Sequence, residues 1–185
     1  SWDLGFAEAT FVYGESEYEE QGQRDQTDLI LDFEYGYEFF PSFSAFTREI
    51  VDEESETLEV RVISQYESKF SWTIGYFENE LDSDATSEEF TPGFDQFAVD
   101  NFGGVQLRPD NLEYIELTDQ YEKETAFYGE LTYQATDYLS FTVGYRDYEF
   151  EVDSRGGFGL PLFDTVFLGE PQDAINVNFG TNAGK

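Results

Sequence analysis

Apolar and polar residues alternate along several stretches of the chain, and a period of two predicts β-strands. The clearest stretches are residues 69–80 and 139–150. In the first, Phe70, Trp72 and Ile74 share one face, while serine, threonine and glycine occupy the other. Each stretch therefore has one apolar face and one polar face, as a strand between two different surroundings requires.

Five further stretches follow this pattern less regularly, which brings the predicted number of strands to seven. They are residues 2–12, 28–37, 42–51, 57–64 and 124–133. In the first of them the apolar set changes face at Glu8, so this stretch either contains a bulge or is a weaker candidate for a strand. The stretch 42–51 does not show which of its faces is apolar. Most of these strands approach the length of about 9–11 residues that a tilted strand needs to cross a bilayer.

The predicted connections fall into two groups by length. Short turns are predicted at residues 38–41, 65–68 and 134–137, and the other connections at residues 13–27, 52–56, 82–120 and 153–185. All of the second group except 52–56 are long. Outer-membrane β-barrels have short periplasmic turns and long extracellular loops. The sequence therefore predicts an all-β, antiparallel up-and-down meander that forms part of a transmembrane β-barrel with this arrangement of connections.

Aromatic residues gather near all three predicted short turns. They are Tyr35, Tyr37, Phe39 and Phe40 at the first, Tyr66, Phe70 and Trp72 at the second, and Tyr133 and Tyr138 at the third. Such rings concentrate where a barrel wall crosses the membrane–water interface. Aromatic pairing across the hairpins of a soluble sheet is the alternative interpretation.

The hairpins also predict a register. For Leu131 to share a face with Val143, the numbers of paired residues must sum to an even number. The same condition applies to the hairpin of residues 57–64 and 69–80. The opposite face then carries charged side chains, which suit a water-filled or plugged interior and are costly against lipid. These side chains are Glu59, Arg61, Glu124, Glu130 and Arg146.

The composition limits the chemistry that the chain can perform. Its 185 residues predict one domain, and 41 acidic against 9 basic residues give a formal charge of −32. Such a charge argues against nucleic-acid binding. Without cysteine or histidine there is no disulfide, thiol nucleophile, imidazole base or thiolate metal site. No catalytic, cofactor-binding or metal-binding residue is predicted, and no enzymatic activity is expected.

Two explanations of the acidic excess stay open. The surface collects cations or is bridged to anionic lipid by divalent ions, or the composition reflects adaptation to salty water. Carboxylates leave calcium binding possible, but Asp82-Ser83-Asp84 lacks the glycine and the closing glutamate that a calcium loop requires at fixed spacing. A solvated acidic loop is the simpler interpretation of these residues.

Two predicted hairpins resemble a known family. Residues 59–65 (EVRVISQ) followed by 70–77 (FSWTIGYF) resemble a hairpin that is common in TonB-dependent outer-membrane receptors. Residues 125–133 (TAFYGELTY) followed by 139–146 (LSFTVGYR) resemble the next hairpin of that family. The order and spacing of these motifs make the resemblance more specific than any one of them.

The resemblance implies a barrel of about 22 strands around an N-terminal plug. Such receptors bind scarce nutrients, often ferric siderophores, outside the cell and import them with energy passed on by TonB. Residues 1–185 would then be a partial barrel domain, without the plug and the remaining strands. The implied partners are the rest of the receptor, TonB, outer-membrane lipid and an unidentified small molecule, in the outer membrane of a Gram-negative bacterium.

The long loops contain charged and aromatic residues that are candidates for contact with a ligand. These are Asp95, Asp100, Arg108, Asp110 and Tyr114. Solvated loop residues are the simpler interpretation, and no binding residue is predicted among them.

Two other classes of protein stay open. A small, complete outer-membrane barrel would need a closing strand within residues 160–185, where 164–168 and 175–179 are the candidates. A soluble acidic β-sheet module of a surface or filament would instead assemble through its open sheet edges.

Overall fold

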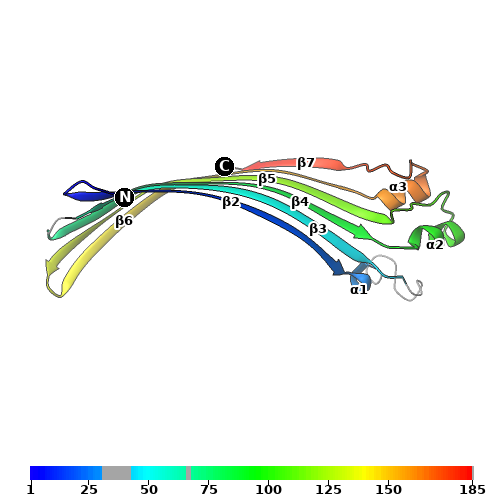
Figure 1. Ribbon diagram of the computed structural model, residues 1–185, viewed down its shortest axis with the longest axis horizontal. Helices are drawn as coiled ribbons and strands as arrows, with labels where there is room; N and C mark the ends of the chain where they lie inside the picture. The colour runs from blue at the N-terminus through cyan, green and yellow to red at the C-terminus, as the bar shows by residue number, and fades with distance from the viewer. Residues whose placement is uncertain (31–42, 66–67, 185) are drawn as a thin grey trace.

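The computed structural model describes residues 1–30, 43–65 and 68–184, which form one curved antiparallel sheet (Figure 1). Within these residues seven strands follow one another in chain order, so each is paired with its neighbours in sequence. The strands are β1 (Trp2–Asp3), β2 (Ala7–Asp25), β3 (Phe46–Ser64), β4 (Phe70–Phe90), β5 (Leu112–Thr136), β6 (Leu139–Gly159) and β7 (Asn178–Gly184). The helices are α1 (Thr27–Ile30), α2 (Phe94–Asn101) and α3 (Pro161–Leu168).

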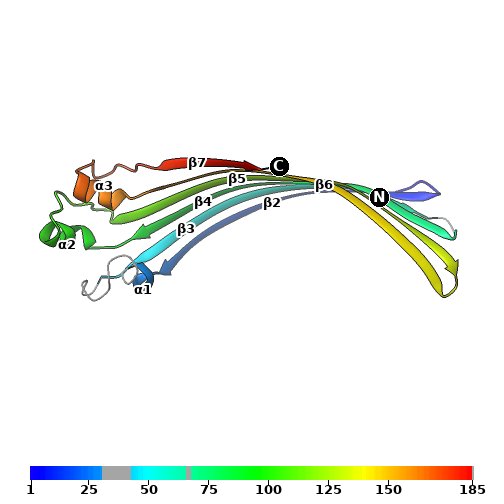
Figure 2. The ribbon, with the colours of Figure 1, turned by 180° about the vertical axis from the view of Figure 1, so that it is seen from behind.

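The connections sort by length between the two ends of the sheet (Figures 1 and 2), which agrees with the predicted arrangement in kind, although two of the predicted connections, 13–27 and 52–56, lie largely or wholly inside strands. The connections 4–6, 65–69 and 137–138 lie at one end. The connections 26–45, 91–111 and 160–177, which contain the three helices, lie at the other end. The predicted turn at 38–41 falls outside the described residues. The all-β, antiparallel up-and-down fold is therefore confirmed.

Individual strands are longer than predicted. Residues 13–25, predicted as a loop, continue β2, and residues 52–56 lie inside β3, which joins two predicted strands into one. The predicted loop 82–120 shrinks to 91–111, because β4 and β5 extend into it from both sides. These extensions carry polar residues on both faces, so the alternation that marks a strand is lost while backbone pairing continues.

The prediction of a strand over 28–37 is wrong at its start, where α1 forms. Asp25 accepts hydrogen bonds from the backbone nitrogen of Thr27 (2.9 Å) and from its hydroxyl (2.6 Å). These bonds lower the pKa of Asp25, first through the hydroxyl and then through the backbone nitrogen. The local turn stops β2 and starts the helix. Residues 31–37 lie outside the described part of the chain.

The predicted register is confirmed. Val62 pairs with Ile74, and Leu131 pairs with Val143. Because paired side chains point to the same side of a sheet, two faces can be defined. Face 1 carries the odd-numbered residues of β2, β5, β6 and β7 and the even-numbered residues of β3 and β4. Face 2 carries the others.

The hydrophobic core of the described residues lies at the end with the long connections rather than on the sheet. Phe94 and Ala98 of α2 pack with Leu162 and Val166 of α3, and α3 also packs against β5. The C-terminal strand β7 pairs only with Val152–Phe158 of β6, at the edge opposite β1. In the described residues, therefore, no strand closes the sheet onto β1. No helix among them is long and apolar enough to cross a bilayer.

We expect the register to be testable with paired cysteines, because the chain has none of its own. The hydroxyls of Thr132 and Thr142 lie 2.8 Å apart on face 2. The double variant Thr132→Cys/Thr142→Cys should form a disulfide under mild oxidation, since the two residues are directly opposite one another on β5 and β6 with their side chains in contact. Leu131→Cys/Thr142→Cys, with side chains on opposite faces, should stay reduced. The measurement is the thiol titre, and equal oxidation of both variants would disprove the register.

Candidate functional site: an apolar band and a folded loop cap

Face 1 carries a continuous apolar band near the short-turn end of the sheet. The band consists of Ala7, Ala9, Phe11, Tyr13, Leu58, Val60, Val62, Phe70, Trp72, Ile74, Tyr76, Phe127, Gly129, Leu131, Tyr133, Leu139, Phe141, Val143 and Tyr145. Most of its large side chains are exposed, from 37% for Tyr133 to 69% for Tyr145. An exposed apolar surface of this extent marks contact with another apolar phase or molecule.

The band ends abruptly on every strand that crosses it. The next residue on face 1 is acidic on four of the strands and a threonine on β5. These first polar residues are Glu15, Glu56, Glu78, Thr125 and Asp147. We call the line between these residues and the band the border.

The border crosses the strands obliquely. In the register, Tyr13 at the border of β2 lies in the same row as Glu149 of β6, through Leu58, Glu78 and Thr125. On β6, however, the last apolar residue is Tyr145, four residues lower. The border therefore moves by four residues over the four steps from β2 to β6: it shifts by two residues between β3 and β4 and by two between β5 and β6, an average of one residue a strand. With about 3.3 Å per residue and about 4.8 Å between strands, this slope is about 35°.

Face 2 is polar at the level of the band. The hydroxyl of Tyr128 donates a 2.5 Å hydrogen bond to Glu59, and its ring lies over the α-carbon of Gly75, where any side chain would collide with it. Arg146 forms a 2.6 Å ion pair with Glu124. Of the charged side chains that the sequence places opposite the band, Arg61 thus pairs with Glu59 (3.8 Å) and Arg146 with Glu124 on face 2.

Beyond the border, face 1 becomes an acidic wall. One row contains Glu19, Asp52, Asp84 and Asp119 side by side and continues to Arg155 of β6 and Thr181 of β7. In the row of Glu80, Lys123 pairs with Glu80 and with Glu78 (3.5 Å). The hydrogen bond to Glu80 is the main reason why the pKa of Lys123 is raised.

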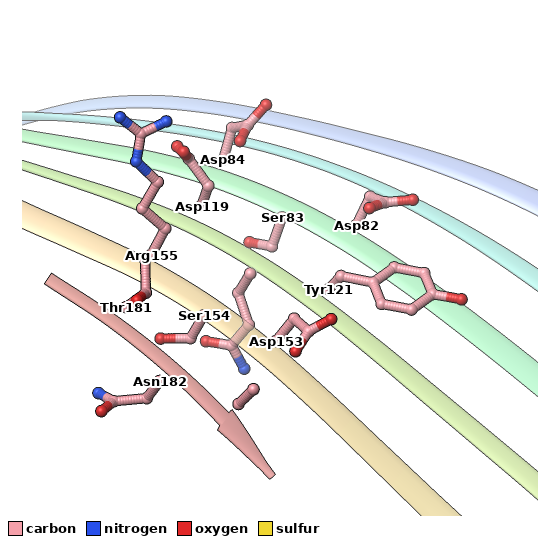
Figure 3. A pocket seen from close by; sticks show the side chains of 12 residues that line it. Asp82, Ser83, Asp84, Asp119, Tyr121, Asp153, Ser154, Arg155, Thr181 and Asn182 are labelled. Carbon is pink, nitrogen blue, oxygen red and sulfur yellow. The ribbon is translucent and has the colours of Figure 1, made fainter. Parts of the chain in front are cut away.

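A hollow of about 440 Å³ lies over this wall across β4, β5, β6 and β7 (Figure 3). Its charged residues are Asp82, Asp84, Asp119, Asp153 and Arg155. The guanidinium of Arg155 lies 4.2 Å from the centre of the Phe179 ring. Asp82 and Asp84 belong to strand β4 and not to a loop, which corrects the sequence-based interpretation. In the part of the chain that the structure describes, no three carboxylates are placed to hold a metal ion, and calcium stays a prediction.

At the other end of the sheet the long connections fold together into what is called here the loop cap, residues 91–111 and 160–177 with Phe43. Aromatic rings join its parts: Phe43 lies 5.6 Å from Phe97 and 6.4 Å from Phe94. Gly169 ends α3 in a left-handed conformation (φ 77°), which glycine adopts without strain.

The fully buried Arg108 ties the loop cap together. Its guanidinium binds both carboxylate oxygens of Asp110, at 2.8 and 2.9 Å. It also donates to the hydroxyl of Thr165 (3.0 Å) and to the carbonyls of Pro161 (3.3 Å) and Ala174 (2.6 Å). One side chain therefore links the β4–β5 connection to α3 and to the segment that follows it.

Backbone contacts strengthen this link. Val105 donates to the carbonyl of Val166 (2.7 Å), and the side chain of Gln172 donates to the carbonyl of Leu107 (2.9 Å). The α-carbon of Gly104 approaches Val166 so closely that an added β-carbon would lie 2.7 Å from it. The two long connections are consequently one packed unit.

The loop residues considered as ligand contacts divide into two groups. Arg108, Asp95 and Asp110 are used inside the loop cap, where Asp95 is buried and accepts from the backbone nitrogen of Arg108 (3.1 Å). Asp100 is exposed and accepts from Gln96 (3.0 Å), and the hydroxyl of Tyr114 donates to Glu116 (3.1 Å). The sequence showed only charged loop residues and gave no signal of the role of Arg108, since its burial depends on contacts about 55–65 residues away.

A further carboxylate group lies on face 2 just below the loop cap. Burial raises the pKa of Glu89, and the nearby carboxylates of Glu113, Glu49 and Glu116 raise it further. Glu49 accepts from Ser87 (3.1 Å) and from Arg24 (3.0 Å). Face 2 therefore has a negative potential at the end of the sheet that is next to the loop cap.

Seven antiparallel up-and-down strands in one sheet, with an apolar band on one face, give a fold similar to that of a β-barrel receptor. Among solved structures, the ferric yersiniabactin uptake receptor FyuA from Yersinia pestis matches with a TM-score of 0.55 and 13% sequence identity. The match covers 94% of this chain and 21% of the receptor, so the chain spans about a fifth of its length. No protein-family model and no curated protein sequence matches the chain.

We expect Arg108→Met to loosen the loop cap and leave the sheet intact. The change removes the guanidinium from a buried hydrogen-bond network, at a cost of about 2–4 kcal/mol to the cap. Amide hydrogen exchange in α2 and α3 should accelerate while exchange in β3–β5 stays slow. The matched control is Arg24→Met, whose 3.0 Å pair with Glu49 is largely exposed and contributes less than about 1 kcal/mol. Unchanged exchange in α2 and α3 would contradict the role of Arg108.

Proposed function

We propose that the chain forms part of the wall of an outer-membrane receptor of the TonB-dependent type, which imports a scarce nutrient such as a ferric siderophore. The observation that carries this proposal is the oblique border of the apolar band. The motifs in residues 57–150 and the similarity to an uptake receptor agree with it.

An oblique border is what a bilayer imposes on a barrel wall. Barrel strands are tilted by about 35–45° from the membrane normal. A plane parallel to the membrane therefore cuts successive strands at shifted positions, and the slope of about 35° matches this tilt. A sheet packed against a protein layer has no reason to end its apolar surface along such a line.

The height of the band fits within a bilayer. On β4 the band runs from Phe70 to Tyr76, six residues apart or about 20 Å along the strand. At a tilt of about 35° this corresponds to about 16 Å along the membrane normal, to which the side chains at both ends add, within the apolar belt of about 25 Å seen in outer-membrane barrels. Tyr13, Tyr76 and Tyr145 stand at the border, where amphipathic rings are favoured.

The proposal requires further strands. In the described residues β7 leaves the edge of β6 from Leu139 to Glu151 without a neighbour, and this stretch includes the band. Unpaired backbone groups cannot face lipid, so a wall must pair both of its edges. The rest of the receptor, with its plug, supplies these strands in our proposal, and TonB supplies the energy.

The long strands place the loop cap far outside the bilayer. Beyond Tyr76, β4 continues to Phe90, about 14 residues or roughly 38 Å along the membrane normal at this tilt. A nutrient arriving from outside meets the loop cap first. The uptake of ferric yersiniabactin by the structurally similar receptor supports a metal chelate as the class of nutrient.

The lipid contact of the band is testable by fluorescence of the complete receptor, once Trp2 and every tryptophan outside these 185 residues have been replaced by phenylalanine. The remaining Trp72 lies in the band and should be quenched strongly by phospholipids with brominated acyl chains. Moving the indole by one residue, in Trp2→Phe/Trp72→Phe/Thr73→Trp, turns it to face 2 and should abolish most of the quenching. Equal quenching at both positions would refute the lipid-facing band. A protein that stays soluble without detergent would favour the assembling β-sheet module.

Uptake is tested in cells. Removal of the protein should abolish energy-dependent accumulation of its ferric chelate under iron limitation, and wild-type protein should restore it. Leu131→Arg puts a charge into the band at a cost of about 2–4 kcal/mol and should lower the amount in the membrane and the uptake together. Ser71→Arg, at an exposed position on face 2 at the level of the band, is the matched control and should leave the amount unchanged. Normal iron accumulation without the protein would overturn the import proposal.

A further inference from the structure

A cluster of carboxylates on face 2, next to the loop cap, is partly withdrawn from water. Glu113 is buried, with 4% of its surface exposed, and Glu89 and Glu49 are half-buried. The pairing shifts by one residue between Glu89 and Phe90, so Glu113 is an extra residue of β5, and such a bulge redirects a side chain. Thr91 donates a hydrogen bond to Glu113. Carboxylates that share a partly desolvated site repel one another, and a cation relieves this repulsion. The members of the cluster are Glu49, Glu89, Glu113 and Glu116.

An unpaired hydroxyl belongs to the same part of face 2. Thr47 is directly opposite Glu89 in the register and two residues from Glu49, so its side chain points to the side of the cluster. Only 3% of its surface is exposed, and its hydroxyl oxygen has no hydrogen-bond partner in the part of the chain that the structure describes. Buried polar groups are normally hydrogen-bonded, so this oxygen indicates a partner outside the chain.

Two aromatic rings flank the cluster on β5 and β6. Tyr114 is opposite Glu89, and its ring stacks on that of Phe158 with 6.0 Å between the ring centres. Aromatic faces attract organic ammonium groups. A metal ion instead needs several carboxylates within direct reach, and no three acidic residues in the described ranges are placed to hold one. These surroundings are therefore more suitable for an organic cation than for a metal ion.

The basic side chains that are nearest by register have other partners. Arg24 binds Glu49 (3.0 Å), and Arg48 binds Glu88 on face 1. The side chain of Arg24 is 65% exposed, so water screens most of its charge. Within the residues that the structure describes, Glu89 has no ion pair with a basic side chain.

We propose that the cluster binds the ammonium group of an organic ligand. The ammonium group lies between Glu89 and Glu113, donates a hydrogen bond to the hydroxyl of Thr47, and meets the ring of Tyr114. In the proposed receptor wall, face 2 is the inner face, so a nutrient reaches the cluster after it has passed the loop cap. The inference rests on the proposed function in this respect, and it adds that the nutrient carries an amine. A chelate with only negative charges would be repelled by the same carboxylates.

The test uses the complete protein in detergent at physiological salt, with divalent ions chelated, and the polyamine spermidine as the probe. Isothermal titration calorimetry measures the affinity. We expect Glu89→Gln to weaken binding about tenfold, because it removes a half-buried charge and keeps the shape of the side chain. Thr47→Val replaces the hydroxyl with a methyl group and should weaken binding about three- to tenfold. The matched control Glu54→Gln removes the same charge from an exposed position on face 1 and should leave the affinity unchanged.

Three results would overturn the site. Equal weakening by Glu89→Gln and Glu54→Gln would mean that spermidine responds only to the overall charge. An unchanged affinity in Thr47→Val would mean that water alone is the partner of the hydroxyl. Calcium that displaces spermidine and depends on Glu89 would replace the organic cation with a metal ion.

The site and the proposed function can fail separately. Protein-dependent iron uptake, together with any of these three results, would remove the site and leave the import proposal standing. Spermidine binding that depends on both Glu89 and Thr47 would retain the site, even if iron accumulates normally in cells without the protein.

Discussion

The register of the hairpins is the constraint on which the other features depend. Side chains alternate with a period of exactly two residues along a strand, so a slip of one residue would exchange Leu131 for Thr132 and turn the band to face 2. A slip of one residue in β3 would likewise bring Glu59 and Arg61 to face 1, where lipid contact is proposed. Because the sheet is a single layer, no packed core holds the register, and the paired backbones and side-chain contacts such as Thr132 with Thr142 must do so.

The acidic wall shows how long strands persist where their side chains repel. Glu19, Asp52, Asp84 and Asp119 stand in one row, and like charges opposite one another destabilise a sheet. Two factors limit the cost. The four carboxylates are exposed, so the high dielectric constant of water weakens their repulsion, and continuous backbone pairing from Ala7 to Asp25 contributes at every residue.

The alternation of apolar and polar residues predicted the features that depend on it, and features that do not depend on it were missed. The register, the sorting of connections by length and the polar face opposite the band follow from the period of two, and the structure agrees. The continuation of β2 through residues 13–25 escaped prediction because glutamates stand on both faces there, so only the partner strand reveals it. The loop cap was not predicted for another reason. Arg108 and Ala174 are far apart in sequence, and no local sequence pattern indicates their contact.

The loop cap and the band lie toward opposite ends of a single sheet. In the proposed receptor wall, the band sets the height of the sheet in the membrane, and strands of 19 to 25 residues connect it to the loop cap. There the two long connections share a core and the buried Arg108, so they form one packed surface rather than two independent loops. Under the proposed function, a ligand that binds this surface would not pay the full entropy of ordering two loops.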